Sequence, residues 1–181
     1  MNRKRPPEPI CRRARSSPLP RQPPFPAMSL EVIIGNHQQL VAIPEKWLTE
    51  WEAAAAEAVA LALRHAADRD SPLFHLATLD VALVDDAKSA QVHQDFMNLE
   101  GATDVITFHH GEIVIGAEVA VRQAAEYGEP LPREILRYLV HGLLHLAGHE
   151  DANPEDRARM DEAQELIVAE LWTEELAERF G

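Results

Sequence analysis

Two histidines and an aspartate near the C-terminal third of the chain have the spacing of a metal site. His141 and His145 are four residues apart in a stretch of strong helix formers, so both imidazoles project from one face of a helix. Gly148 can end that helix in a left-handed conformation. The chain can then turn back and bring Asp151 toward the same ion. The pattern His-x-x-x-His-x-x-Gly-x-x-Asp therefore predicts a divalent metal held by His141, His145 and Asp151.

Two alternatives stay open for these residues. His149 lies four residues after His145 and would be the third ligand if the helix continued through Gly148. In the second alternative no metal is bound: the two histidines lie on a solvated helix face, and Asp151 caps a turn. Leucines surround both histidines, however, and unpartnered imidazoles on a half-buried helix are costly. We therefore favour the metal site, with Asp151 as its third ligand.

The ligand set also limits the chemistry. Three protein ligands leave the fourth position of a zinc ion open, which is typical of catalytic rather than structural sites. A zinc peptidase of the His-Glu-x-x-His type has a glutamate directly after the first histidine as its general base. Here that position is Gly142. The segment therefore predicts a metal-dependent hydrolase and argues against a peptidase.

The elements that must position this segment alternate between strands and helices. The order predicts one α+β domain, in which a small mixed sheet is packed with helices and the metal site lies at the C-terminal end of a central helix. The turn at residues 109–111 would join two strands as a hairpin or as neighbours in the sheet. Expected strands cover residues 30–34, 75–84, 103–108 and 112–115, and expected helices cover residues 44–67, 86–97, 117–127, 132–146 and 154–177.

Charge is divided unevenly along the chain, whose net charge is −13. Residues 1–27 carry seven basic residues, one acid, eight of the 13 prolines and the single cysteine, Cys11. This composition predicts a disordered tail, and Met28 is an alternative start of the protein. Residues 28–181 form the expected domain, with 10 basic and 29 acidic residues. So acidic a domain argues mildly against nucleic acid as a partner.

Neither a secretory signal nor a membrane span is recognisable. Residues 1–27 contain no apolar core of the kind that a signal peptide requires. No run reaches the 18 or so apolar residues of a membrane-spanning helix. We therefore expect a cytoplasmic protein with no membrane partner.

Two segments resemble the YbeY family, the bacterial metal-dependent endoribonucleases and rRNA maturation factors. Residues 141–148 match the family segment His-Gly-x-Leu-His-Leu-x-Gly fully. The family segment Pro-Thr-Asp-Val-Leu-Ser-Phe, followed by Gly-Asp-Ile, is represented by residues 102–108 and then 111–113. The resemblance extends in order over most of residues 30–175.

The resemblance implies a zinc-dependent, single-strand-specific endoribonuclease with one Zn²⁺ ion. It would act in 16S rRNA 3′-end maturation and in ribosome quality control. Its partners would be rRNA, the small ribosomal subunit and ribosomal proteins, and not DNA. The resemblance also places Thr103 and Asp104 near the metal, and Asp104 or Glu150 is the candidate proton acceptor. From the residues alone, Asp104 would rather cap or pair beside a strand.

Two departures from the family pattern bear on function. The family's third histidine aligns with Asp151, and an arginine that serves RNA phosphate in the family aligns with Met97. Phosphate contacts normally need lysine or arginine. Any RNA contact must then depend on the metal, on a few local basic residues, of which Arg122, Arg133 and Arg137 are candidates, on the basic tail, or on the ribosome itself. A non-catalytic, metal-stabilised ribosome assembly factor is therefore the second functional hypothesis, and a metallopeptidase is the third.

Overall fold

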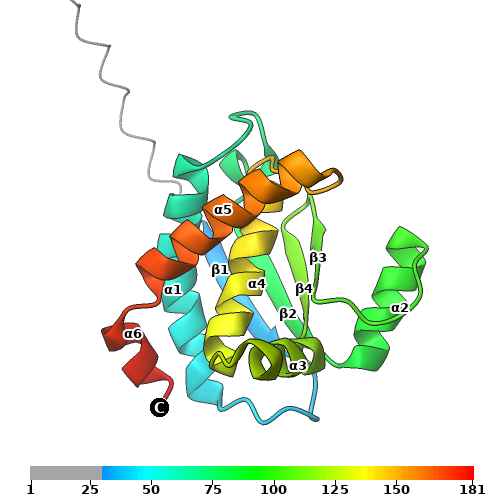
Figure 1. Cartoon of the computed structure of the whole chain (residues 1–181), viewed down its shortest axis with the longest axis vertical. Coiled ribbons are helices and arrows are strands. Elements are labelled where there is room, and N and C mark those ends of the chain that lie inside the picture. Colours follow the sequence, from blue (N-terminus) through cyan, green and yellow to red (C-terminus); the bar gives the residue numbers. More distant parts are fainter. Residues whose placement is uncertain (1–29) are drawn as a thin grey trace, which may run out of the picture.

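The fold is built on a four-stranded mixed sheet with the strand order β1-β2-β4-β3 (Figure 1). The computed structural model describes residues 30–181, so the expected tail of residues 1–27 and the alternative start at Met28 lie outside the described residues. β1, β2 and β4 are parallel neighbours, and β3 pairs antiparallel with β4. The strands are β1 (Glu31–Asn36), β2 (Thr78–Val84), β3 (Val105–Phe108) and β4 (Glu112–Gly116).

The strands β3 and β4 form the expected hairpin. Phe108 is opposite Glu112 in the ladder, and the amide of Gly111 donates to the Phe108 carbonyl at 2.9 Å. Gly111 has a φ of +97°, which a side chain would oppose. This hairpin brings the Thr-Asp-Val segment to the edge of the sheet, beside the central helix.

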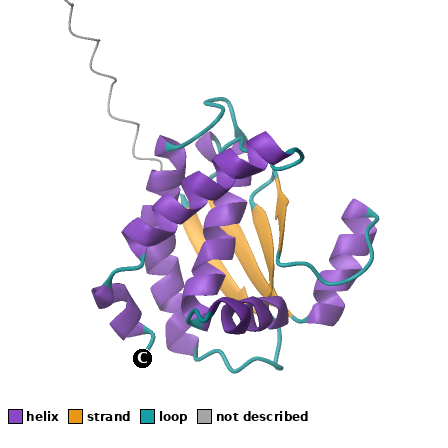
Figure 2. Ribbon diagram, viewed as in Figure 1, coloured by secondary structure: helices purple, strands orange, loops and turns teal. Residues whose placement is uncertain are grey.

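Six helices accompany the sheet, and Figure 2 shows most of them stacked on one side of it. α1 and α4 contact the strands, while α5 crosses over α4. α2 stands beside the sheet in Figure 1 and contacts α3, whose Arg122 pairs with Asp86 of α2. The helices are α1 (Glu45–Arg64), α2 (Asp86–Met97), α3 (Ala117–Tyr127), α4 (Leu131–Leu146), α5 (Pro154–Leu171) and α6 (Glu174–Arg179), and a short 3-10 helix, η1, covers Pro72–Phe74.

The helix α4 is the centre of the core. It contacts α1, α3, α5, β3 and β4, and its leucines other than Leu131 are almost completely buried. Gly142 permits the close approach to the sheet, because a Cβ atom there would lie 2.7 Å from Cδ1 of Ile113 and 3.0 Å from Oγ1 of Thr107. α4 is therefore fixed from all sides, and its C-terminal end can hold side chains in defined positions. The expected α+β architecture is confirmed.

The last expected helix is wrong in one respect. It was expected to run continuously to residue 177, whereas α5 ends at Leu171 and α6 begins at Glu174. The Thr173 hydroxyl accepts from the amide of Leu176 at 3.2 Å and so caps the new helix. The turn also lets Trp172 stack on Phe180, with ring centroids 5.6 Å apart.

The opposite face of the sheet carries a smaller apolar cluster, made by Val84, Val92, Ile106 and Val114. Val92 comes from α2, so this cluster attaches α2 to the sheet. None of the helices between residues 30 and 181 is both long and apolar enough to span a membrane.

Candidate metal centre

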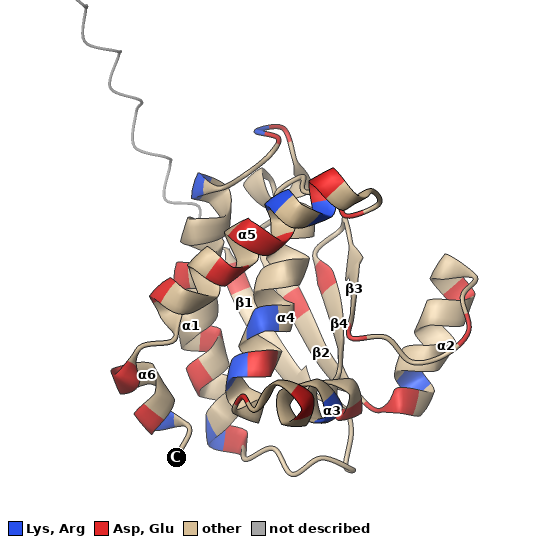
Figure 3. Ribbon diagram, viewed as in Figure 1, with Lys and Arg blue, Asp and Glu red and all other residues tan. Residues whose placement is uncertain are grey.

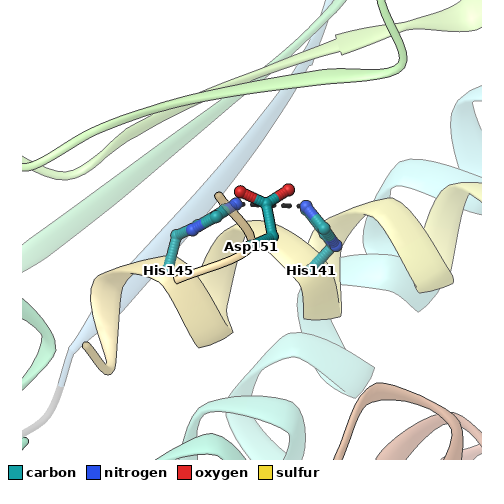
Figure 4. A group of neighbouring side chains, drawn as sticks. All are labelled: His141, His145 and Asp151. Carbon is teal, nitrogen blue, oxygen red and sulfur yellow. Dashed lines mark hydrogen bonds between the residues drawn. The ribbon is translucent and has the colours of Figure 1, made fainter. Parts of the chain in front are cut away.

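The C-terminal half of α4 presents His141 and His145 side by side. Their Nε2 atoms are 3.1 Å apart, as the one-turn spacing of the residues requires. The ligand atoms of His141, His145 and Asp151 all lie within 4.8 Å of one another (Figure 4). The structure thus brings together the three residues that the sequence selects.

Both imidazoles are held by their other ring nitrogen. Nδ1 of His141 lies 2.9 Å from the side-chain oxygen of Gln164, and Nδ1 of His145 lies 3.1 Å from the carbonyl oxygen of His149. Each of these oxygens accepts, so each Nδ1 carries the proton and each Nε2 keeps its lone pair. The two Nε2 atoms that face each other are therefore the atoms available to a metal ion. Gln164 belongs to α5 and was missed in the sequence, where nothing marks its approach to α4.

The turn after α4 directs Asp151 toward the histidines. Gly148 has a φ of +90°, and the amide of His149 donates to the carbonyl of Leu144 at 3.0 Å, which closes the helix end. The loop that follows α1 packs closely here, because a Cβ atom on Gly148 would lie 2.8 Å from Cβ of Asp68. Glycine is thus required both for the backbone conformation and for the contact.

The alternative third ligand, His149, has another partner. Its Nε2 atom lies 2.7 Å from the carbonyl oxygen of His65, at the end of α1. His149 is also absent from the group of ligand atoms that gathers around the histidine pair among residues 30–181. The geometry therefore favours Asp151 as the third ligand.

The environment keeps His145 in the form that binds metals. Burial lowers the pKa of His145, and the neighbouring imidazole of His141 lowers it further. The carboxylates of Asp151 and Glu150 oppose this shift but do not reverse it. His145 is consequently neutral at pH 7, as a ligand must be.

The donor set matches zinc in type and in spacing. Two neutral imidazoles and one carboxylate are common ligands of catalytic zinc, with bonds of about 2.1 Å. Two ligands of a tetrahedral ion with such bonds lie about 3.4 Å apart, close to the 3.1 Å between the two Nε2 atoms. The Asp151 carboxylate has only a short distance to close. These residues therefore fit a single divalent ion.

The three residues lie in an open cleft of about 920 Å³. One wall contains Asp104, whose Oδ1 accepts from the Thr103 hydroxyl at 2.9 Å and from the Val105 amide at 2.8 Å. Asp104 is thus a cap beside a strand, as its surroundings in the sequence predict, and it also faces the cleft. Glu150 lines the cleft next to the ligand turn. The role of Asp104 or Glu150 as proton acceptor stays a prediction.

The wall that contains Thr103 is tied to α2. The Ser89 hydroxyl donates to the Thr103 carbonyl at 2.9 Å and accepts from the Thr103 amide at 3.0 Å. Ser89 is almost completely buried. This pair of hydrogen bonds sets the position of the Thr-Asp-Val segment opposite α5.

Two hydroxyls in the cleft lining have no hydrogen-bond partner of ordinary geometry, those of Tyr138 and Thr107. Burial raises the pKa of Tyr138 well above its usual range, and the carboxylates of Glu134 and Asp104 raise it further. Tyr138 therefore stays protonated, and its hydroxyl is buried.

None of the three arginines expected to contact phosphate presents a free guanidinium to the cleft. Arg122 makes two hydrogen bonds to Asp86, and Arg133 pairs with Glu129; neither arginine lines the cleft. Arg137 lines the cleft, but its guanidinium is bonded to two carboxylates, those of Glu134 and Glu165.

Two further residues of the cleft bear on the expected phosphate contact. Met97 does line the cleft, so the position that the resemblance assigns to a phosphate contact faces it with an apolar side chain. Arg157, which no motif of the sequence marks, also lines the cleft.

The structure gives a second reason against the peptidase hypothesis. Gly142 faces Ile113 and Thr107 of the sheet, where there is no room for a side chain. A glutamate could not occupy this position without moving α4 off the sheet.

Comparisons with known proteins agree with these observations. The family model described as Endoribonuclease YbeY matches residues 34–172. The protein named Endoribonuclease YbeY from Symbiobacterium thermophilum is 32% identical over 159 residues, which cover 78% of this chain and 97% of the relative. The relative of the same name from Rhodopirellula baltica is 38% identical over 131 residues, or 65% of this chain and 64% of the relative.

Coverage is smaller for a third relative of that name, from Myxococcus xanthus. It is 37% identical over 105 residues, which are 51% of this chain and only 36% of the relative. Among solved structures, the solution structure of TM1509 from Thermotoga maritima superimposes with a TM-score of 0.56 at 25% identity, covering 81% of this chain and 93% of that one. From the family match, the Symbiobacterium relative and the shared fold together, the chain belongs to the YbeY endoribonuclease family.

Proposed function

We propose that this chain is a zinc-dependent endoribonuclease that cleaves single-stranded RNA. We propose further that it acts in the 3′-end maturation of 16S rRNA and in ribosome quality control, with rRNA, the small ribosomal subunit and ribosomal proteins as its partners. One observation carries the proposal: the donor atoms of His141, His145 and Asp151 converge in an open cleft, with both imidazoles oriented by their Nδ1 atoms.

The cleft is suited to phosphodiester cleavage. A zinc ion in this position would act as a Lewis acid toward the phosphoryl group and would make a water molecule acidic enough to react near neutral pH. Asp104 or Glu150 would accept the proton of the attacking group, which is either water or the neighbouring ribose hydroxyl.

A non-catalytic role in ribosome assembly is the second candidate, because the cleft is acidic. Two basic residues line it, Arg137 and Arg157. The carboxylates that line it are Asp104, Glu134, Glu150, Asp151 and Asp161. Such a surface opposes RNA binding unless bound metal and a few local cations offset its charge.

A cleavage assay separates the two candidates. The full chain would be incubated with single-stranded RNA, with and without a chelator, and its zinc content would be measured by elemental analysis. We expect chelator-sensitive cleavage and about one zinc ion per chain. His145→Ala should lose both the zinc and the cleavage, whereas His110→Ala, which changes an exposed histidine outside the cleft, should keep both.

The opposite results would contradict the nuclease. A zinc-loaded chain that does not cleave RNA, yet sediments with small ribosomal subunits, would support the assembly factor. Cleavage that persists in His145→Ala would show that the metal centre is not the active site.

A further inference from the structure

An RNA-cleaving site needs a cation for the phosphates that flank the scissile bond, and the cleft offers two. Arg137 and Arg157 are the only lysine or arginine side chains that line it within residues 30–181. Phosphate binding requires a guanidinium whose donors are not already taken. The two arginines differ sharply in this respect.

The guanidinium of Arg137 is already engaged in ion pairs within the protein. Its Nε atom donates to Oε1 of Glu165 at 2.8 Å, and its Nη1 atom pairs with the buried carboxylate of Glu134. Removing Arg137 from these pairs would leave the Glu134 charge buried and unpaired, which is costly. Arg137 therefore serves the packing of α5 on α4 and is not free for a ligand.

Arg157 is held only weakly. Its Nε and Nη2 atoms both point to the backbone carbonyl of Asp151, at 3.4 Å, the long limit of a hydrogen bond. Arg157 forms no ion pair with any carboxylate of residues 30–181. Asp161, which lies one helical turn further along α5, is not paired with it either. The guanidinium thus lies beside the third ligand with its charge uncompensated.

The surroundings make this charge stand out. Figure 3 shows basic residues near the start of α5, while most of the charged residues along the rest of this helix are acidic. Arg159, the other arginine of α5, is paired with Asp156 and does not line the cleft. Arg157 is therefore the one described cation that both faces the cleft and lacks an ion pair.

We propose that Arg157 binds a phosphate of single-stranded RNA beside the metal centre, in place of the contact that Met97 cannot make. The inference rests on the proposed function and adds a residue to it. The planar guanidinium can reach two oxygens of one phosphate, and its position beside Asp151 would place that phosphate next to the three candidate ligands.

The test compares three variants of the full chain by fluorescence anisotropy with a labelled single-stranded RNA at several salt concentrations. Arg157→Ala should weaken binding about tenfold, the usual effect of losing a charged hydrogen bond. Its affinity should also depend less on salt, with a slope smaller by about 0.7, as for one lost phosphate contact. Arg157→Lys, which keeps a point charge, should weaken binding about threefold.

Arg159→Ala is the matched control, because it removes the same charge from the same helix outside the cleft. It should change affinity less than twofold, and zinc content should be the same in all variants. In cleavage assays, Arg157→Ala should raise KM more than it lowers kcat. If Arg157→Ala and Arg159→Ala bind RNA alike while the unmodified chain cleaves it, the role of Arg157 is refuted and the nuclease stands. If the unmodified chain neither binds nor cleaves RNA, both proposals fail.

Discussion

The side-chain oxygen of Gln164 lies 2.9 Å from Nδ1 of His141 and decides which nitrogen of that imidazole faces the cleft. Gln164 is itself buried, and its amide nitrogen donates to Glu165 at 3.2 Å, so its orientation is set. The first of the two candidate metal ligands on α4 is thus positioned by a residue of α5. Such outer partners commonly matter for metal affinity nearly as much as the ligands do.

The first prediction concerns this contact. Gln164→Leu should weaken zinc binding about tenfold or more, because His141 loses the acceptor that fixes its tautomer. A competition titration with a chromophoric chelator measures the affinity. Gln123→Leu, a change of another glutamine of the cleft, should leave it unchanged. Equal affinities of the two variants would show that Gln164 does not orient His141.

The second prediction concerns the third ligand. Asp151→Ala should lose most of its zinc, whereas His149→Ala should keep it, because His149 is hydrogen-bonded to the carbonyl of His65. Elemental analysis of both purified variants gives the answer. A stoichiometric metal content in Asp151→Ala, with loss in His149→Ala, would reverse the assignment.

The third prediction concerns the turn that carries Asp151. Gly148→Ala should destabilise the protein by about 3 kcal/mol, because a methyl group adds a steric conflict with Asp68 to the cost of a left-handed residue. Gly128→Ala is the control, since Gly128 has a φ of +67° but open space around it, and should cost about 1 kcal/mol. Urea unfolding measures both values. Equal losses would mean that the contact with Asp68 contributes nothing.

The fourth prediction concerns acid stability. The hydrogen bond that Glu165 accepts from Arg137 lowers the pKa of Glu165 below the ordinary value of 4.5. A lowered pKa means that the ionised carboxylate stabilises the fold at neutral pH and that this contribution is lost as the pH falls through the lowered pKa. Glu165→Gln should therefore cost about 0.5 kcal/mol at pH 7, a small value because Glu165 is half exposed, and progressively less as the pH falls below 4.5 to about 3.

Urea unfolding of Glu165→Gln and the unmodified chain at both pH values would measure this difference. Glu162→Gln, a neutralisation of an exposed carboxylate on the same helix, serves as the control and should have little effect at either pH. A loss for Glu165→Gln that is as large at pH 3 as at pH 7 would point to packing and not to charge.

The sequence was sufficient for those parts of the site that depend on local geometry. His141, His145 and Asp151 lie within one helix end and its turn, so helical periodicity and a glycine predict their convergence. Gln164, which orients His141, is 23 positions away from it along the chain. His65, whose carbonyl oxygen contacts His149, is 84 positions away from it. Nothing in the local sequence marks Gln164 or His65 for these roles.

Whether Arg122, Arg133 and Arg137 are free to contact phosphate could not be predicted from the sequence, for a related reason. Their availability depends on ion pairs formed across the fold, such as those of Arg122 with Asp86 and of Arg137 with Glu165. The break between α5 and α6 was missed because Thr173 lies among good helix formers, and only the packing of Trp172 on Phe180 shows why the chain turns there. Tertiary contacts decided both outcomes.

The hydrogen bond between Gln164 and His141 has a thermodynamic consequence as well. Because α5 must be docked on α4 for Gln164 to orient His141, metal affinity and the docking of α5 are linked, and each must strengthen the other by the same free energy. Metal binding would then tighten the helix that carries Arg157. In this protein, loading the ion would be coupled to shaping the surface that receives the substrate.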